Sequence, residues 1–161
     1  MITLKLSHPS DRNLTTLIPE AARLAAGLTA RILDKDPKVT SVAVEVVSST
    51  HWFVAGESLA DQRLASFFLE VRISEGTNTK QQKEAFVAQA FAEFRELLGE
   101  LHNESYVHVI DARSDAYGYG GRTQERRFIE NRSPLGAPPQ QLLASVRGAT
   151  LRTDVQRAVR G

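Results

Sequence analysis

The chain is poor in several residue types that would indicate a specialised chemistry. Its 161 residues include no cysteine, one methionine and one tryptophan. The absence of cysteine excludes disulfides, thiol redox chemistry and thiolate metal sites. No run of about 18 apolar residues could cross a bilayer, and no basic and apolar signal segment opens the chain. We therefore expect a cytoplasmic protein without a membrane partner.

What is present is the composition of one globular domain, because 42% of the residues are hydrophobic and 24% are charged. The net charge is only +1, yet residues 122–161 carry eight arginines against three acidic residues. That segment has no lysine and no aromatic residue beyond Phe128. It lacks the stacking residues of a single-strand nucleic-acid binder, so we expect no nucleic-acid partner. Its arginines are expected to dock on acidic surface of the same or a neighbouring subunit, or to stay solvated.

Two segments of the chain share one layout. Residues 42–56, VAVEVVSSTHWFVAG, and residues 106–121, YVHVIDARSDAYGYGG, each have an apolar strand, a polar bend, an aromatic residue and a small-residue ending. The aromatics are Trp52 and Tyr117, 65 positions apart. At the same offset Gly56 falls on Gly121. The sequence therefore predicts two similar half-domains.

Each half has the pattern strand, helix, strand. In the first half, residues 2–6 alternate as a strand and apolar residues between 14 and 32 recur on one helix face. We expect Thr15 or Thr16 to cap that helix, which places Pro19 in its first turn or so, and residues 36–37 to end it.

The second half repeats the pattern. A strand over 67–73 is followed by a capping box of Thr79 and Gln82, and Gly99 is the expected stop of the helix. The predicted buried face of this helix comprises Phe86, Ala90, Phe91, Phe94 and Leu98.

Two such units predict parallel strand pairs and two helices on the same face of a four-stranded sheet. The strand residues predicted to face the helices are Leu4, Leu6, Val42, Val44, Val46, Phe67, Leu69, Val71, Val107 and Val109. The alternate set is Thr3, Lys5, Ala43, Glu45, Val47, Phe68, Glu70, Arg72, Tyr106, His108 and Ile110. This second face is too apolar for open water, so we expect it to be buried between subunits of an oligomer.

At this point the residues carry a family resemblance. Residues 75–87, EGTNTKQQKEAFV, then YVHVI and the closing AYGYGG of the second half resemble a subunit of 4-oxalocrotonate tautomerase (4-OT). The first half resembles it through SVAVEVV and HWFVAG. The order of elements is similar to that of the fused, two-unit members of the tautomerase superfamily, which includes macrophage migration inhibitory factor (MIF).

The resemblance implies an α+β fold of tandem β-α-β units with a four-stranded mixed sheet, assembled as a homotrimer around a central barrel. It implies a tautomerase-like domain over 1–130, with repeats over 1–62 and 63–130, and leaves 131–161 as a basic arm. It also implies pockets at subunit edges that bind a small unsaturated carboxylate. There an amino-terminal proline is the general base and arginines hold the carboxylate. No cofactor is implied.

The chain departs from this family pattern at its catalytic base. It starts Met1-Ile2, and an initiator methionine is usually retained before isoleucine. The corresponding position of the second half, near residues 66–67, is internal and has no free amine. We therefore expect little or no conventional keto-enol tautomerase activity. The alternative is an active isomerase in which the primary amine of Met1, with its pKa lowered by desolvation, is the base.

The residues that would hold the substrate are also altered. The turn where family subunits often carry an arginine is Gly76-Thr77-Asn78, and a strand position for another holds Ala43 and His108 in the two halves. Arg72, Arg113 and Arg122 are candidate substitutes, although Arg72 shares a strand face with Glu70 and is a candidate to pair with it or with Glu45.

Four further residues are candidates for the site. His108 is an alternative base, since imidazole transfers protons near neutral pH, or a packed and hydrogen-bonded histidine. Trp52 and Tyr117 stand at the family's pocket-wall position and could equally be core residues. Tyr119 lies in the same hairpin as Tyr117. The four histidines have no metal-ligand spacing, so no metal site is expected.

Beyond Gly121 the resemblance fades. Residues 122–130 are expected to continue the hairpin or to add an edge strand. A linker-like break over 133–139 then leads to weak helical spacing over 140–159. We expect this arm to pack on a neighbouring subunit, stabilising the trimer or covering its pocket, because it has too few apolar residues for a core of its own.

Overall fold

A computed structural model describes residues 1–8 and 13–132 of the chain. The chain divides into two compact units, Met1–Arg113 and Ser114–Gly161. The predicted linker over 133–139 and the weak helix over 140–159 lie outside the described residues, and the domain boundary at residue 130 stays a prediction.

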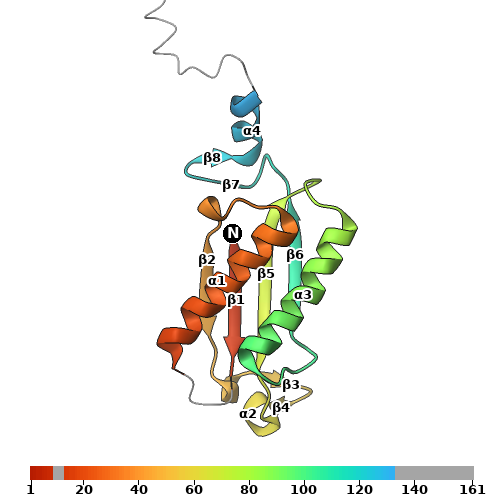
Figure 1. The fold of residues 1–161 in the computed structure, drawn as a ribbon. Helices are drawn as coiled ribbons and strands as arrows, with labels where there is room; N and C mark the ends of the chain where they lie inside the picture. Colours follow the sequence, from red (N-terminus) through yellow and green to blue (C-terminus); the bar gives the residue numbers. More distant parts are fainter. Residues whose placement is uncertain (9–12, 133–161) are drawn as a thin grey trace, which may run out of the picture. The chain divides into compact units, whose positions relative to one another are not determined.

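The first unit is built on a four-stranded mixed sheet (Figure 1). Its strands are β1 (Ile2–Ser7), β2 (Val42–Val46), β5 (Ser66–Ser74) and β6 (Tyr106–Ala112), in the order β2-β1-β5-β6. The pairs β1–β2 and β5–β6 are parallel, whereas the central pair β1–β5 is antiparallel. This confirms the predicted sheet of two β-α-β units.

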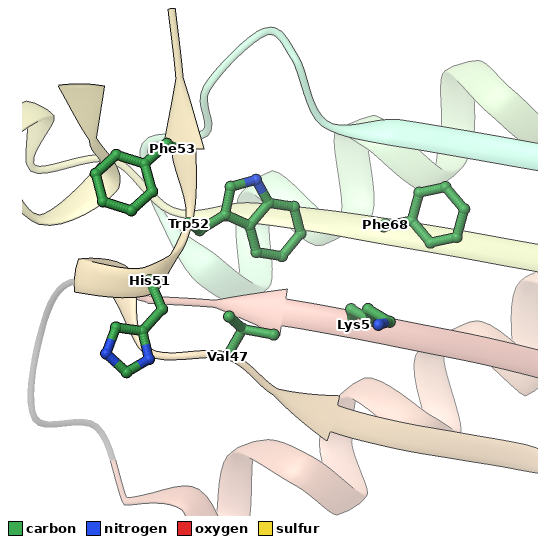
Figure 2. A pocket seen from close by; sticks show the side chains of 6 residues that line it. All are labelled: Lys5, Val47, His51, Trp52, Phe53 and Phe68. Atoms are coloured by element: carbon green, nitrogen blue, oxygen red, sulfur yellow. The ribbon is translucent and has the colours of Figure 1, made fainter. Parts of the chain in front are cut away.

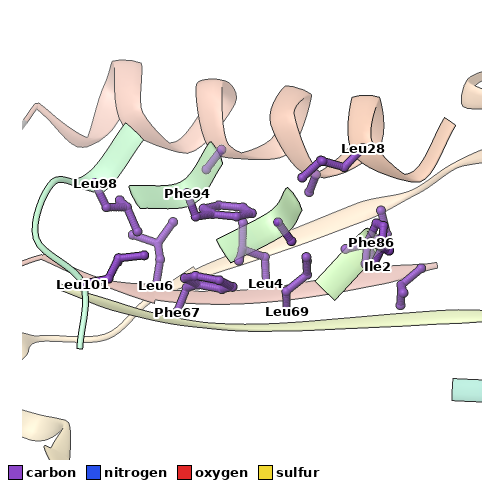
Figure 3. Close-up of a cluster of buried hydrophobic side chains, with 14 of the residues drawn as sticks. Ile2, Leu4, Leu6, Leu28, Phe67, Leu69, Phe86, Phe94, Leu98 and Leu101 are labelled. Atoms are coloured by element: carbon purple, nitrogen blue, oxygen red, sulfur yellow. The ribbon is translucent and has the colours of Figure 1, made fainter. Parts of the chain in front are cut away.

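Helices α1 (Leu14–Leu33) and α3 (Lys80–Leu98) cover the same face of this sheet (Figure 1). Both crossovers join parallel strands, and the right-handed rule for such crossovers places both helices on one side when the two units are related by a twofold. Figure 3 shows the side chains packed between helices and strands. The Phe67 and Phe94 rings stack with centroids 4.6 Å apart, and neither is exposed to solvent. The predicted helix-facing strand residues all belong to this core or pack against it.

The ends of the two helices were predicted with unequal success. The capping box of Thr79 and Gln82 is confirmed, and Gly99 caps the carboxyl end of α3 with φ of 88°. The prediction for α1 was wrong, because Asn13 is its N-cap and accepts a hydrogen bond from the Thr15 amide at 3.0 Å. Pro19 therefore lies in the second turn, and the helix ends at residue 33 with Asp34 in the left-handed conformation.

The opposite face of the sheet is uncovered within the first unit. Tyr106 is 56% exposed, His108 is exposed on the same strand, and Glu45 is exposed on β2 at the other edge of the sheet. Two ion pairs lie on this face, one between Lys5 and Glu45 and one between Arg72 and Glu70. The prediction of an alternate, partly apolar face without helices is confirmed.

The remaining elements of the first unit are short. A 3-10 turn η1 (Pro37–Val39) precedes β2, and η2 (Ser49–His51) follows it. A hairpin of β3 (Phe53–Val54) and β4 (Glu57–Ser58) then leads into α2 (Leu59–Gln62).

The second unit repeats this hairpin 65 positions later. Strands β7 (Gly118–Tyr119) and β8 (Arg122–Thr123) lead into α4 (Gln124–Arg132). The main-chain bond from Leu59 N–H to Trp52 O, 2.9 Å, has its counterpart from Gln124 N–H to Tyr117 O, 2.8 Å. The duplication thus extends beyond Gly121. Of the two expectations for 122–130, continuation of the hairpin is confirmed at Arg122–Thr123, whereas an edge strand is wrong because α4 follows. Thr123 Oγ1 accepts from the Arg126 amide at 3.2 Å and starts a helix at that point.

Candidate functional site

The start of β1 brings two predicted site residues together. The Arg72 amide donates to the Met1 carbonyl across 3.1 Å, since β1 and β5 are antiparallel and Ile2 lies opposite Val71. Partial burial lowers the pKa of the Met1 α-amine from its ordinary value, and the positive charge of Arg72 lowers it further. Both effects disfavour the ammonium form. Near neutral pH this amine therefore has a larger neutral fraction than an ordinary amino terminus.

The Arg72 guanidinium is already engaged. One of its nitrogens lies 2.5 Å from a Glu70 carboxylate oxygen on the uncovered face. Of the two acidic residues predicted as partners, Glu70 is the one that pairs with Arg72, whereas Glu45, on β2, pairs with Lys5 at 3.2 Å. Arg72 can hold a substrate carboxylate only by sharing or exchanging this partner.

His108 stands apart from the Met1 end of the sheet. It lies opposite Glu70 in the β5–β6 register, whereas Arg72 lies opposite Ile110. Its side chain is exposed in the first unit, and the choice between a base and a packed, hydrogen-bonded histidine stays a prediction. Ala43, at the equivalent strand position of the first half, lies opposite Thr3.

The other predicted residues lie in or near the second unit. Arg113 is the last residue of the first unit. In the second unit Arg122 pairs with Glu130 at 3.0 Å, and the Arg127 guanidinium lies 3.8 Å from the centre of the Tyr119 ring. Tyr117 accepts the main-chain bond that starts α4. Arg122 and Tyr119 thus each have a partner within their own unit.

Trp52 lines an open cavity of about 450 Å³ in the first unit, together with five residues that the sequence analysis did not select (Figure 2). These are Lys5, Val47, His51, Phe53 and Phe68. Figure 2 shows the Trp52 indole extending toward Phe68, with Lys5 and Val47 beside it. Three of the missed residues, Lys5, Val47 and Phe68, belong to the alternate strand face, and that membership was the signal that could have found them.

Residues 1–8 and 13–132 contain no group of three or more histidine or acidic side chains placed to hold a metal ion. In the same residues no helix is long and apolar enough to span a membrane.

The fold defined by these elements is the tautomerase β-α-β fold in its fused, two-unit form. A native fused 4-OT matches with a TM-score of 0.64 and 22% identity, over 77% of this chain and 97% of the other. The F6 fused 4-OT, an asymmetric trimer, matches with a TM-score of 0.64 and 16% identity, over 78% of this chain and 98% of the other.

A third similar structure belongs to a family that is named for a dehalogenase. N1, a member of the cis-3-chloroacrylic acid dehalogenase family, has a TM-score of 0.63 and 15% identity, over 91% of this chain and 99% of its own. No family model and no curated protein matches the sequence. The likeness therefore concerns the fold.

Proposed function

We propose that the chain is a subunit of the tautomerase superfamily that forms a homotrimer and binds a small unsaturated carboxylate at subunit interfaces. We further propose that it has little or no conventional keto-enol tautomerase activity. The observation that supports this most is the start of β1, where Met1 rather than proline lies beside Arg72, and Arg72 is paired with Glu70.

The proposal of a homotrimer is based on the uncovered face of the sheet. This face exposes Tyr106 and carries Phe68 and Ile110, and burial between copies would remove that apolar surface from water. The F6 fused 4-OT, which has the same fold, is a trimer. Sedimentation equilibrium should give three times the chain mass of 17.8 kDa, and a monomer at micromolar concentration would contradict the proposal.

Two features of the site support the proposal of low tautomerase activity. A primary amine lacks the ring that fixes the position of the proline nitrogen, and the Arg72 guanidinium is already paired with the Glu70 carboxylate. Binding of a carboxylate can persist without proton transfer, because charge and apolar contact are sufficient for it. Tyr117, Tyr119, Arg113 and Arg122 are proposed to contribute to this binding together with Trp52.

A second function is favoured by one specific observation, the lowered pKa of the Met1 α-amine. An isomerase that shifts a proton in an enol or dienol carboxylate needs a base that is unprotonated near neutral pH. Burial and the charge of Arg72 both lower the pKa of the Met1 amine, so a larger fraction of it is unprotonated near neutral pH. His108 is the alternative base, and its side chain is exposed within the first unit.

The test follows ketonisation of 2-hydroxymuconate and phenylenolpyruvate by ultraviolet absorbance. The native chain is compared with a variant that has proline inserted between Met1 and Ile2, so that removal of the initiator exposes the proline. Silence of the native chain with activity in the variant supports the binding protein. Turnover by the native chain that is lost when its amino group is blocked, and retained in H108Q, supports the Met1 isomerase instead.

A further inference from the structure

The carboxyl end of α1 is held by side chains from the second half of the chain. The side-chain amide of Asn78 donates to the Leu33 carbonyl at 2.9 Å, and that of Gln82 donates to the Ile32 carbonyl at 3.4 Å. Both carbonyls lie in the last turn of α1, where carbonyls have no partner within the helix. We call this contact the α1–α3 joint, because it ties the two β-α-β units together.

Lys35 follows α1 and takes part in this joint. Its Nζ atom donates to the Thr77 hydroxyl at 2.9 Å, and that hydroxyl donates in turn to the Ser74 carbonyl at 2.6 Å. Lys35 is half-buried at this position. The Thr77 oxygen carries no charge, so it stabilises the ammonium form of the lysine less than a carboxylate would.

The other lysines of the chain lie in different surroundings. Lys5 and Lys83 each pair with a carboxylate, and an opposite charge stabilises the ammonium form. Lys38 and Lys80 are exposed at the surface. Lys35 thus combines a half-buried position with an uncharged hydrogen-bond partner.

These surroundings favour the neutral amine of Lys35. Partial burial lowers the pKa of Lys35 from its ordinary value, and the charge of the nearby Asp34 carboxylate acts in the opposite direction. The neutral amine is the nucleophilic form of a lysine. Near neutral pH, Lys35 therefore has a larger reactive fraction than an ordinary lysine.

We propose that Lys35 is a site of acylation by small acyl thioesters. The neutral amine nitrogen attacks the thioester carbonyl carbon, a C–N bond forms, and the C–S bond breaks. The second amine proton passes to the departing sulfur, so the products are an uncharged amide and a free thiol. The site goes beyond the function proposed above, since it needs neither the amino terminus nor a subunit interface.

Acylation at this position acts on the α1–α3 joint. It removes a positive charge from the carboxyl end of α1, where a cation interacts favourably with the helix dipole. It also adds an acyl group to a half-buried side chain beside Thr77. We therefore expect the amides of residues 77–82 to exchange their hydrogens faster in the acylated chain, and unchanged exchange would overturn this consequence.

The test of the site compares the reactivity of individual lysines. The full-length native chain is treated near neutral pH with the acetyl thioester of N-acetylcysteamine. It is then unfolded, and the remaining amines are acetylated with deuterated acetic anhydride. Trypsin then cleaves only at arginine, so Lys35 and Lys38 remain in one peptide, residues 32–63, whose fragment masses give the light-to-heavy ratio at each lysine.

Lys38 is the internal control, because it lies three positions away in the same peptide. We expect Lys35 to be acetylated at least about threefold faster than Lys38 in the folded chain, and at an equal rate in urea. Equal rates in the folded chain would overturn the proposal. A preference for Lys35 that persists in urea would also overturn it, since the local sequence and not the joint would then be the cause.

Two variants sharpen the assignment. D34N removes the carboxylate that stabilises the Lys35 ammonium, and asparagine is compatible with the left-handed backbone at this residue. It should therefore speed acetylation of Lys35, and a slower reaction would contradict the proposal. D36N is the matched control, since Asp36 accepts from the Lys38 amide at 2.8 Å and asparagine retains that acceptor. It should leave the Lys35 rate unchanged.

Discussion

Arg72 lies 2.5 Å from Glu70 on the uncovered face of the sheet, and its amide simultaneously holds the carbonyl of Met1. One residue thus joins the amino terminus to a carboxylate two positions back on β5. A positive charge disfavours protonation of a nearby amine, so Arg72 lowers the pKa of the Met1 amine. We expect Glu70 to modulate this effect through its ion pair with Arg72.

The first prediction concerns the Met1 amine. R72Q should raise its pKa, yet leave it below the ordinary value, because burial is the larger of the two causes that lower it. The neutral fraction at neutral pH therefore falls in this variant. An NMR titration of the isotopically dimethylated amine measures the change.

Glu70 provides the control for this measurement. In E70Q the charge of Arg72 is no longer compensated, so the pKa of the amine should move lower than in the native chain. Shifts of the same sign in both variants would show that the ion pair does not control the amine.

The second prediction concerns catalysis by the isomerase alternative. If Met1 is the base, kcat/KM for phenylenolpyruvate should rise with pH and level off above the pKa of the amine, because the neutral amine is the reactive form. The inflection should lie below the ordinary pKa of an amino terminus and move upward in R72Q. An inflection that R72Q does not move points to another base.

The third prediction concerns the aromatic pair in the core. Phe94 stacks on Phe67 and is inaccessible to solvent, so F94A should destabilise the fold by about 3–5 kcal/mol through lost contacts and a cavity. Urea unfolding at one fixed protein concentration measures this, because subunit assembly adds to the apparent stability. V87A, at an exposed position of the same helix, should change stability by less than about 0.5 kcal/mol.

The fourth prediction concerns the capping box of α3. T79A removes the oxygen that accepts from the Gln82 amide at 3.2 Å and should cost about 1 kcal/mol. T79S keeps a hydroxyl in the same place and should retain most of the native stability. Equal losses in the two variants would mean that the methyl group of Thr79, rather than the cap, matters.

The fifth prediction concerns the turn of the first hairpin. Ala55 has φ of 54°, where the repeat places Gly120 with φ of 56°. A left-handed residue with a Cβ carries a cost of roughly 1–2 kcal/mol, partly offset by the greater freedom of glycine in the unfolded chain. A55G should therefore stabilise the fold by roughly 0.5–1 kcal/mol in thermal or urea unfolding.

Gly56 supplies the opposite case in the same turn. Its φ is 85° and a Cβ there would meet no atom within 4 Å, so the cost of G56A is purely conformational. We expect G56A to destabilise the fold, and a gain in stability would contradict the account of this turn.

Much of the fold was predictable because its signals are local. The alternation of apolar residues in each strand distinguishes a helix-facing set from an alternate set, and the spacing of Thr79 and Gln82 specifies a helix start. Helix α4 was missed because its sequence has no apolar stripe, and only its correspondence with α2 explains where it begins. The sequence did not single out Asn13 as the N-cap of α1, because Thr15 and Thr16, which follow it, are also typical cap residues.

The sequence by itself determined the duplication, the two helix-facing strand sets and the chemical types of residue at the start of β1. Only the tertiary structure decided which charged side chains pair with one another, because strand register is a long-range property. Register placed Glu45 opposite Lys5, which left Glu70 to Arg72. It also brought Lys5 and Phe68, 63 positions apart in sequence, side by side under Trp52, and no local pattern could have shown that a cavity forms there.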